Sequence, residues 1–132
     1  MTATTDLRAF LIADAGVAAI TTSVHVNRIP EDKTEPWVWI RKSRTWYLEA
    51  TGEARRIDRT DFDIECVSSD LAEADQLRDA VADALEAFTG GELGSETYTW
   101  CRVEDQFDDY VPRSVDADEA LHVCAVVAEL TH

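Results

Sequence analysis

The chain has 132 residues, of which 45% are hydrophobic, and its 27 acids against 12 Lys and Arg give a formal net charge of −15. This length fits a single domain, residues 1–132, that buries about two-thirds of the surface exposed by its unfolded chain. Binding to nucleic acid or to an anionic membrane needs clustered cations, so the charge disfavours both.

The sequence also predicts where the protein is made. No apolar run approaches the ~20 residues that a membrane span needs, and MTATTDLRAF lacks the features of a secretion signal. The three cysteines, Cys66, Cys101 and Cys124, are odd in number and far apart, which favours free buried thiols in a reducing cytosol. We therefore expect a soluble protein, made inside a cell, that makes no membrane contact.

The first predicted element is a short helix over Asp6–Ala13, whose apolar residues share one face. Asp14–Gly16 interrupts it, and Val17–Ile20 forms a further helical turn. A strand is then expected to begin at Val24, before the turn-forming residues of Pro30–Pro36.

A β-hairpin is predicted next. Trp37–Leu48 is rich in strand formers and is expected to be a central strand, and Thr60–Val67 returns after a loop at Ala50–Arg56. The returning strand alternates between apolar and acidic residues, which predicts one core face and one wet, acidic face. Its apolar residues are Phe62, Ile64 and Cys66, and its acids are Asp61, Asp63 and Glu65.

The clearest element is an amphipathic helix over Ser69–Phe88. Its apolar stripe runs from Leu71 to Phe88, Asp70 is placed to cap its first amides, and Gly90 with Gly91 allows a left-handed exit. Nothing in it suggests chemistry, so we expect it to cover one face of the sheet.

Two further strands, TYTWCRVEDQ and ALHVCAVVAEL, are expected to pair as an antiparallel hairpin. The long segment Glu104–Glu119 between them is expected to be a loop, and loops of this length tend to be functional or disordered. The fold class that follows is α+β: a mainly antiparallel sheet of four to five strands packed against one long helix, with a short N-terminal helix.

Catalytic and metal-binding patterns are weak. The acids Asp61, Asp63 and Glu65 share a strand side, but alternation at this density is typical of a wet sheet face rather than of an acid–base pair. The acids of Glu104–Glu119 lack the glycine and spaced glutamate of a calcium loop, and the histidines are scattered. We predict no enzyme activity, no cofactor and no metal.

Two groups of residues can be interpreted as binding a partner. One is a small basic cluster, interpreted as a solvated turn or, alternatively, as a docking patch for an acidic neighbour. The other comprises the tryptophans, interpreted as core and subunit-contact anchors. The basic cluster is Arg41, Lys42, Arg44, Arg55, Arg56 and Arg59; the tryptophans are Trp37, Trp39, Trp46 and Trp100.

The succession of these segments resembles the tail completion, or tail-to-head joining, family of long-tailed phages and prophages. The resemblance is carried by LRAFLIADAGVAAI, EPWVWIRKS, DFDIECVSSDLAEADQLRDAVADALEAF, RVEDQFDDYVPRS and ALHVCAVVAEL. It implies a structural virion protein without a substrate, made in the host cytoplasm, that forms a homo-hexameric ring between the head connector and the tail tube. DNA would pass through this ring without binding to it.

The resemblance also suggests site residues. Asp61, Asp63 and Glu65 become candidate channel-facing or exposed acids that repel phosphates. The long loop becomes a candidate interaction segment that docks on a neighbouring ring. Its residues are Gln106, Phe107, Asp108, Asp109, Tyr110, Pro112 and Arg113.

Two other hypotheses remain open at this stage. One is an acidic bacterial α+β module, similar to an immunity protein, that neutralises a basic partner. The other is a small hydrolase that uses the acids of Thr60–Val67, although no companion motif supports it.

Overall fold

The computed structural model describes residues 3–28, 35–49, 56–88, 91–93, 96–98, 100–111 and 121–131. Its elements are α1 Ala3–Ala13, α2 Ala15–Ala18, β1 Val24–Val26, β2 Trp37–Glu49, β3 Arg56–Ser68, α3 Leu71–Ala87, β4 Gly91–Leu93, β5 Glu96–Tyr98, β6 Trp100–Val111 and β7 Leu121–Thr131. The predicted α+β class is confirmed.

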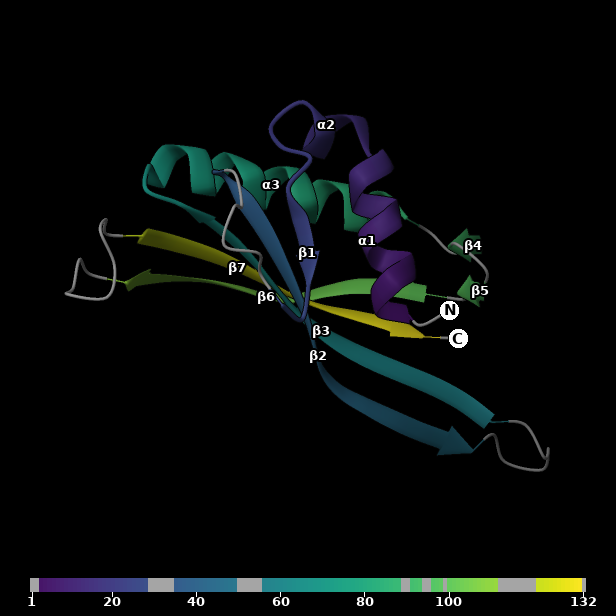
Figure 1. The fold of residues 1–132 in the computed structure, drawn as a ribbon. Helices are drawn as coiled ribbons and strands as arrows, with labels where there is room; N and C mark the ends of the chain where they lie inside the picture. The colour runs from purple at the N-terminus through teal and green to yellow at the C-terminus, as the bar shows by residue number, and fades with distance from the viewer. Residues whose placement is uncertain are drawn as a thin grey trace.

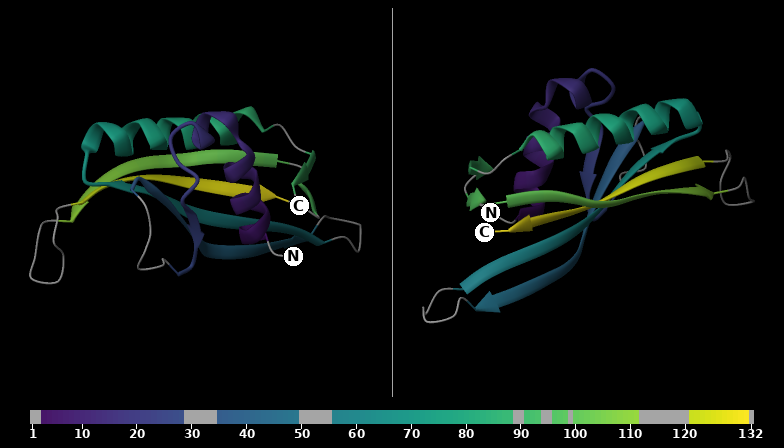
Figure 2. Two further views of the ribbon diagram at one scale, coloured as in Figure 1. Left: turned by 45° about the horizontal axis from the view of Figure 1, so that its top comes forward. Right: turned by 180° about the vertical axis from the view of Figure 1, so that it is seen from behind.

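Five strands form the main sheet in the order β1-β2-β3-β7-β6, and β4 and β5 form a separate two-stranded ribbon. Strand β1 runs parallel to β2, while all other pairs of the main sheet are antiparallel. All three helices lie on the same side of this sheet (Figures 1 and 2). The architecture therefore has two layers, and no helix of the described residues lies over the other face of the sheet.

The core lies between α3 and the sheet, and the alternation of β3 creates it. Phe62, Ile64 and Cys66 are fully buried, as predicted from their spacing. Across the antiparallel ladder they stand opposite Ala128, Val126 and Cys124 of β7, so apolar residues of both strands point to the helix side. The facing residues of α3 are Ala74, Leu77, Val81, Ala82, Ala84 and Leu85.

Helix α3 begins where the sequence predicts. The Asp70 side chain caps it by accepting a hydrogen bond from the Ala72 amide at 3.0 Å. The helix ends at Ala87, and Phe88 leaves it in an extended conformation, while Gly90 lies outside the described residues. The predicted apolar stripe is wrong at one position. Leu71 is 50% exposed because it lies at the start of the helix, beyond the edge of the packed face.

The N-terminal helices pack beside α3 and hold β1 in place. Arg8 of α1 donates from Nε to the Val24 carbonyl at 2.9 Å, and the Phe10 ring meets the Phe88 ring edge-on with centroids 5.5 Å apart. The predicted break is confirmed and has a cause, since the Asp14 side chain accepts from the Val17 amide and caps α2.

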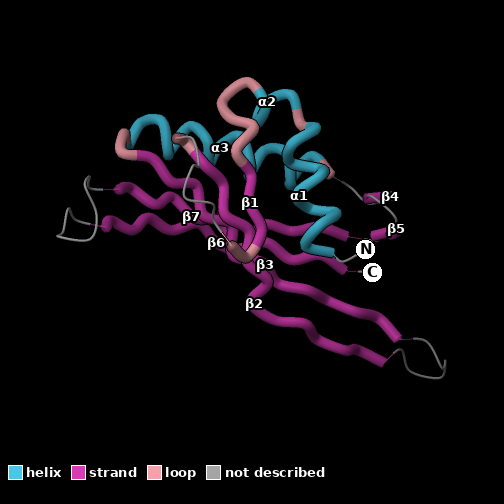
Figure 3. Tube along the Cα trace, in the orientation of Figure 1, coloured by secondary structure: helices cyan, strands magenta, loops and turns pink. Residues whose placement is uncertain are grey.

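The prediction of a long loop over Glu104–Glu119 is wrong for its first half. Strand β6 continues to Val111 and pairs with β7 along this whole length (Figure 3). The register shifts between Val103 and Asp105, so the alternation of side chains changes face there and no simple period-two pattern is visible. The strongly β-prone sequence of β7 supplies the hydrogen-bonding partner that this polar strand needs.

The prediction that Trp37–Leu48 is the central strand is also wrong, because the central strand of the sheet is its neighbour β3. Strand β2 has β1 on its far side only as far as Ile40, because β1 is short, and β3 is the strand in the middle of the sheet. From Arg41 to Glu49, β2 pairs with β3 alone. Beyond Trp46, whose partner Arg59 is the last described residue of β3 that pairs with β7, the hairpin projects from the body of the sheet (Figure 1).

Candidate interaction surfaces

The face of the sheet turned away from α3 is the first candidate surface, and we refer to it as the open face. The pairing registers place the outward residues of β2, β3 and β7 on it. They are Trp37, Trp39, Arg41, Arg59, Asp61, Asp63, Glu65, Val67, Val123, Ala125, Val127 and Glu129.

The acids of β3 lie on the open face, but they are not the wet acidic surface that was expected. The side chains of Asp61 and Glu65 are only 14% and 17% exposed. Asp61 accepts from Arg59 at 3.1 Å, and Glu65 accepts from Arg41 at 3.0 Å. Asp63 is half-buried, opposite Arg41 in the ladder. Because Asp61 and Glu65 each pair with an arginine of the same sheet, this part of the open face carries mixed charge.

One acid of this surface was missed in the sequence. Glu129 of β7 is 2% exposed, stands opposite Asp61, and its Oε2 lies 2.9 Å from Arg59 Nη2. A lone acid inside the apolar run ALHVCAVVAEL was the available signal, since a carboxylate is seldom buried unless a cation pairs with it. Arg59 thus forms ion pairs with two carboxylates, Asp61 and Glu129.

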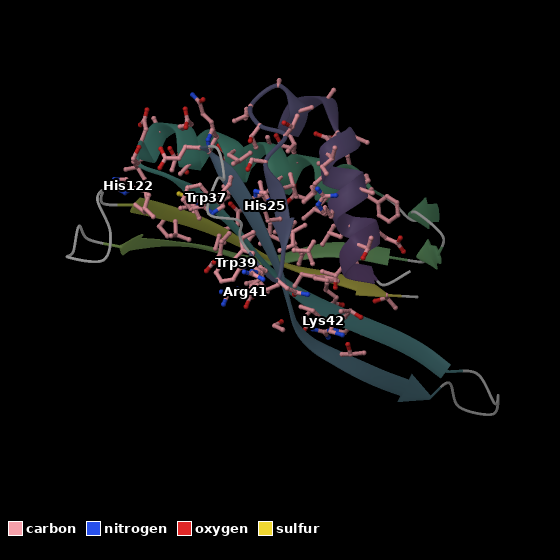
Figure 4. The ribbon with its side chains drawn as sticks, viewed as in Figure 1. His25, Trp37, Trp39, Arg41, Lys42 and His122 are labelled. Carbon is pink, nitrogen blue, oxygen red and sulfur yellow. The ribbon has the colours of Figure 1, made fainter. Side chains whose placement is uncertain are left out.

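The end of the open face near the start of β2 is apolar. Trp37, Val67 and Val123 are buried there in a second cluster, and Trp39 and Leu121 pack against it. Trp39 donates from its indole nitrogen to the Asn27 carbonyl at 3.0 Å, and the Arg41 guanidinium lies 4.3 Å from the centre of the Trp39 ring (Figure 4). Trp37 and Trp39 are therefore fixed in the sheet, and their role as subunit-contact anchors stays a prediction.

The candidate interaction segment falls mainly on β6, the edge strand of the sheet. Gln106, Phe107, Asp108, Asp109 and Tyr110 are strand residues, and the side chains of Gln106 and Asp108 are exposed. Pro112 and Arg113 lie outside the described residues.

Asp108 of this segment forms an ion pair with Arg78 of α3. The side chain of Arg78 is only 15% exposed. The acid three residues before it, Asp75, binds the same guanidinium. The pair with Asp108 therefore links the helix to the edge strand, while the pair with Asp75 lies within the helix.

Most of the basic cluster lies on strands rather than in a turn. Arg41, Lys42 and Arg44 belong to β2, and Arg56 and Arg59 belong to β3, while Arg55 lies outside the described residues. Lys42 is exposed on β2, just beyond the reach of β1 (Figure 4). The interpretation as a solvated turn is therefore wrong for these five residues, and a docking patch stays a prediction.

The two described thiols, Cys66 and Cys124, are free, buried and directly opposite each other in the ladder. Burial raises the pKa of the Cys66 thiol far above its usual range and raises that of Cys124 to about 11. Both are therefore neutral core residues at physiological pH. Cys101 lies on β6.

The described residues contain neither a candidate metal site nor a candidate membrane-spanning helix. In that part of the chain, no three His, Cys, Asp or Glu side chains gather closely enough to hold a metal ion. Among the same residues, none of the helices combines the length and apolarity that crossing a membrane requires.

Comparison with known proteins identifies the family. The family model "Tail completion protein gp17" matches residues 5–126. A chain of the solved structure "Virion of native gene transfer agent (GTA) particle" has a similar fold, with a TM-score of 0.64 and 18% identity, over 98% of this chain and 93% of that one. No curated protein sequence matches. The match spans both layers of the fold, from α1 to β7, and the chain therefore belongs to the tail completion protein gp17 family, as a non-enzymatic structural component of a phage virion.

Proposed function

We propose that six copies of this chain form a ring that completes the phage tail and joins it to the head connector, with the tail tube on the other side. The family match over residues 5–126 is the observation that carries this proposal. When a protein lies between two assemblies that both have rotational symmetry, its copies can make equivalent contacts with both if they repeat around the same axis. A closed ring meets this condition and leaves a hole on the axis for DNA.

The charge supports passage of DNA without binding. Six copies at −15 each would carry −90, and a wall of this sign repels phosphates. Asp61, Asp63 and Glu65 stay the proposed channel-facing acids, with a smaller effect than bare carboxylates would have because Arg59 and Arg41 pair with two of them.

Deleting the coding region in the particle-producing host tests tail completion directly. Negative-stain electron microscopy should then show separate heads and tails, and expression of the wild-type chain in trans should restore joined particles. Joined, infectious particles in the deletion strain would overturn the proposal. Mass measurement of the protein on purified tails gives the copy number, and any number other than six per tail would overturn the hexamer.

The contact segment Gln106–Arg113 can be tested with a matched pair of glutamines. Gln106 of β6 and Gln76 of α3 are both exposed. Gln106→Lys should reduce the fraction of joined particles at least tenfold in the complementation assay, while Gln76→Lys should leave it unchanged. Equal joining by the two variants would remove Gln106 from the contact segment.

A further inference from the structure

Besides the short edge strand β1, the main sheet has two longer edges that no other strand of the described residues pairs. The first is β2 from Arg41 to Glu49, beyond the reach of β1; we name it the basic edge. The second is β6, Trp100–Val111, at the opposite end of the strand order; we name it the acidic edge. Each edge offers a row of backbone donors and acceptors that an added strand could use.

The two edges carry opposite charge. The basic edge starts with three cations in four residues, Arg41, Lys42 and Arg44, in a chain that holds only 12 Lys and Arg. The acidic edge has one arginine, Arg102, against four acids. These acids are Glu104, Asp105, Asp108 and Asp109.

Charges on an edge strand normally prevent unwanted pairing, and here they discriminate between two kinds of pairing. Two basic edges repel each other, as do two acidic edges, so a symmetric dimer through either edge is disfavoured. A basic edge and an acidic edge attract each other. Because they lie at opposite ends of one sheet, this pairing is head-to-tail, and head-to-tail contacts generate rings when the rotation closes.

The faces of the two edges also match. By register Lys42 lies on the α3 side of the sheet, where it is exposed. On β6 the register places Asp108 on the same side, and it is also exposed. A sheet that continues from one copy into the next therefore brings a cation and an acid to the same face.

We propose that the basic edge of one copy adds to the acidic edge of a second copy of this chain, so that the sheet continues across the subunit boundary. This inference rests on the ring of the proposed function and specifies its interface. The projecting β2–β3 hairpin is then an arm that reaches the neighbouring copy.

Zero-length carbodiimide cross-linking of purified particles tests the contact, because the chain has only two lysines, Lys33 and Lys42. Lys33→Arg leaves Lys42 as the single lysine. Denaturing gels should then show a ladder of covalent multimers, and peptide mass spectrometry should join Lys42 to an acid of β6, with Asp108 expected first. Within one chain the two edges are separated by three strand spacings, about 14 Å, so a direct amide between them can form only between copies.

The control is Lys33→Arg with Lys42→Arg, which keeps the charge and removes the amine. Its particles should still be joined, and the Lys42 cross-link should vanish. A second experiment swaps charges: Arg44→Glu should reduce joined particles at least tenfold, and Asp109→Arg in the same chain should restore them. Circular dichroism melting of each purified variant separates a lost interface from a lost fold.

Other partners for the basic edge give distinct results. Cross-links from Lys42 to a connector or tube protein, or a ladder formed without Lys42, would overturn the proposal. The proposal would also fail if particles with Arg44→Glu lost their DNA while the Lys42 cross-links between copies persisted. Tail joining and this interface fail separately. If the deletion strain cannot join heads to tails but particles that contain the chain show no Lys42 links, only the interface is refuted. If particles that contain the chain show the Lys42 links but the deletion strain still joins, only the function is refuted.

Discussion

Arg78 of α3 forms an ion pair with Asp108 of β6 and so fastens the long helix to the edge strand of the sheet. The same guanidinium binds Asp75, one turn earlier in the helix. Arg78 is mostly buried while Asp108 is 61% exposed, which places the pair at the rim of the core.

The first prediction concerns this pair. Arg78→Met should lower the free energy of unfolding by about 1 kcal/mol, since a half-exposed ion pair is partly screened by water. Asp108→Asn should cost less, because Asp75 still binds the arginine. Urea denaturation of both single variants and the double variant yields the coupling energy. Strict additivity of the two changes would show that the pair contributes nothing.

The second prediction compares two arginines of the open face. Arg59→Ala leaves Glu129 buried without its cation, and we expect a loss of about 2–3 kcal/mol in unfolding free energy. Arg41→Ala is the matched control, because the Arg41 side chain is 43% exposed, and should cost about 1 kcal/mol or less. Thermal and urea unfolding measure both. A larger loss for Arg41→Ala would contradict the assigned burial of Glu129.

The third prediction concerns the start of α3. Asp70→Ala removes the side chain that accepts from the Ala72 amide and should destabilise the protein by about 1 kcal/mol. Asp70→Ser restores an acceptor and should recover most of that loss. If the two variants unfold at the same urea concentration, the cap does not stabilise this helix.

The fourth prediction concerns the buried thiols. In a Cys101→Ser variant, Cys66 and Cys124 should react with a thiol reagent at pH 8 only as fast as the protein opens, because burial keeps both protonated. Urea should make both thiols reactive within the mixing time. Rapid labelling of the folded protein would contradict their placement in the core.

The same thiols predict a pH dependence of stability. The pKa of Cys124 is raised from 9.0 to about 11 in the folded protein, so above pH 9 the unfolded state binds fewer protons than the folded state. Stability from this group is complete below pH 9 and is lost as the pH rises toward 11. Cys66→Ala with Cys124→Ala should have a flatter profile between pH 9 and 11, measured by urea unfolding. Parallel profiles for variant and wild type would refute the linkage.

The sequence by itself determined the elements with strong local signals. The spacing of Leu77, Val81 and Leu85 fixes a helix with one buried face, and the alternation of Phe62, Ile64 and Cys66 fixes a strand with one buried face. These patterns are local because side-chain periodicity follows directly from backbone geometry. The order of the segments then pointed to the family that the comparison identifies.

The tertiary structure alone decided how far β6 extends and what neutralises the acids of the sheet. Residues 104–111 form a strand because β7 lies beside them and pairs with their backbone groups, not because of their own propensity. Arg59 meets Glu129 although the two are far apart in the chain, because the β3–β7 register brings them together. Hydrogen bonding and ion pairing between distant strands depend on register, and register exists only once the sheet has formed.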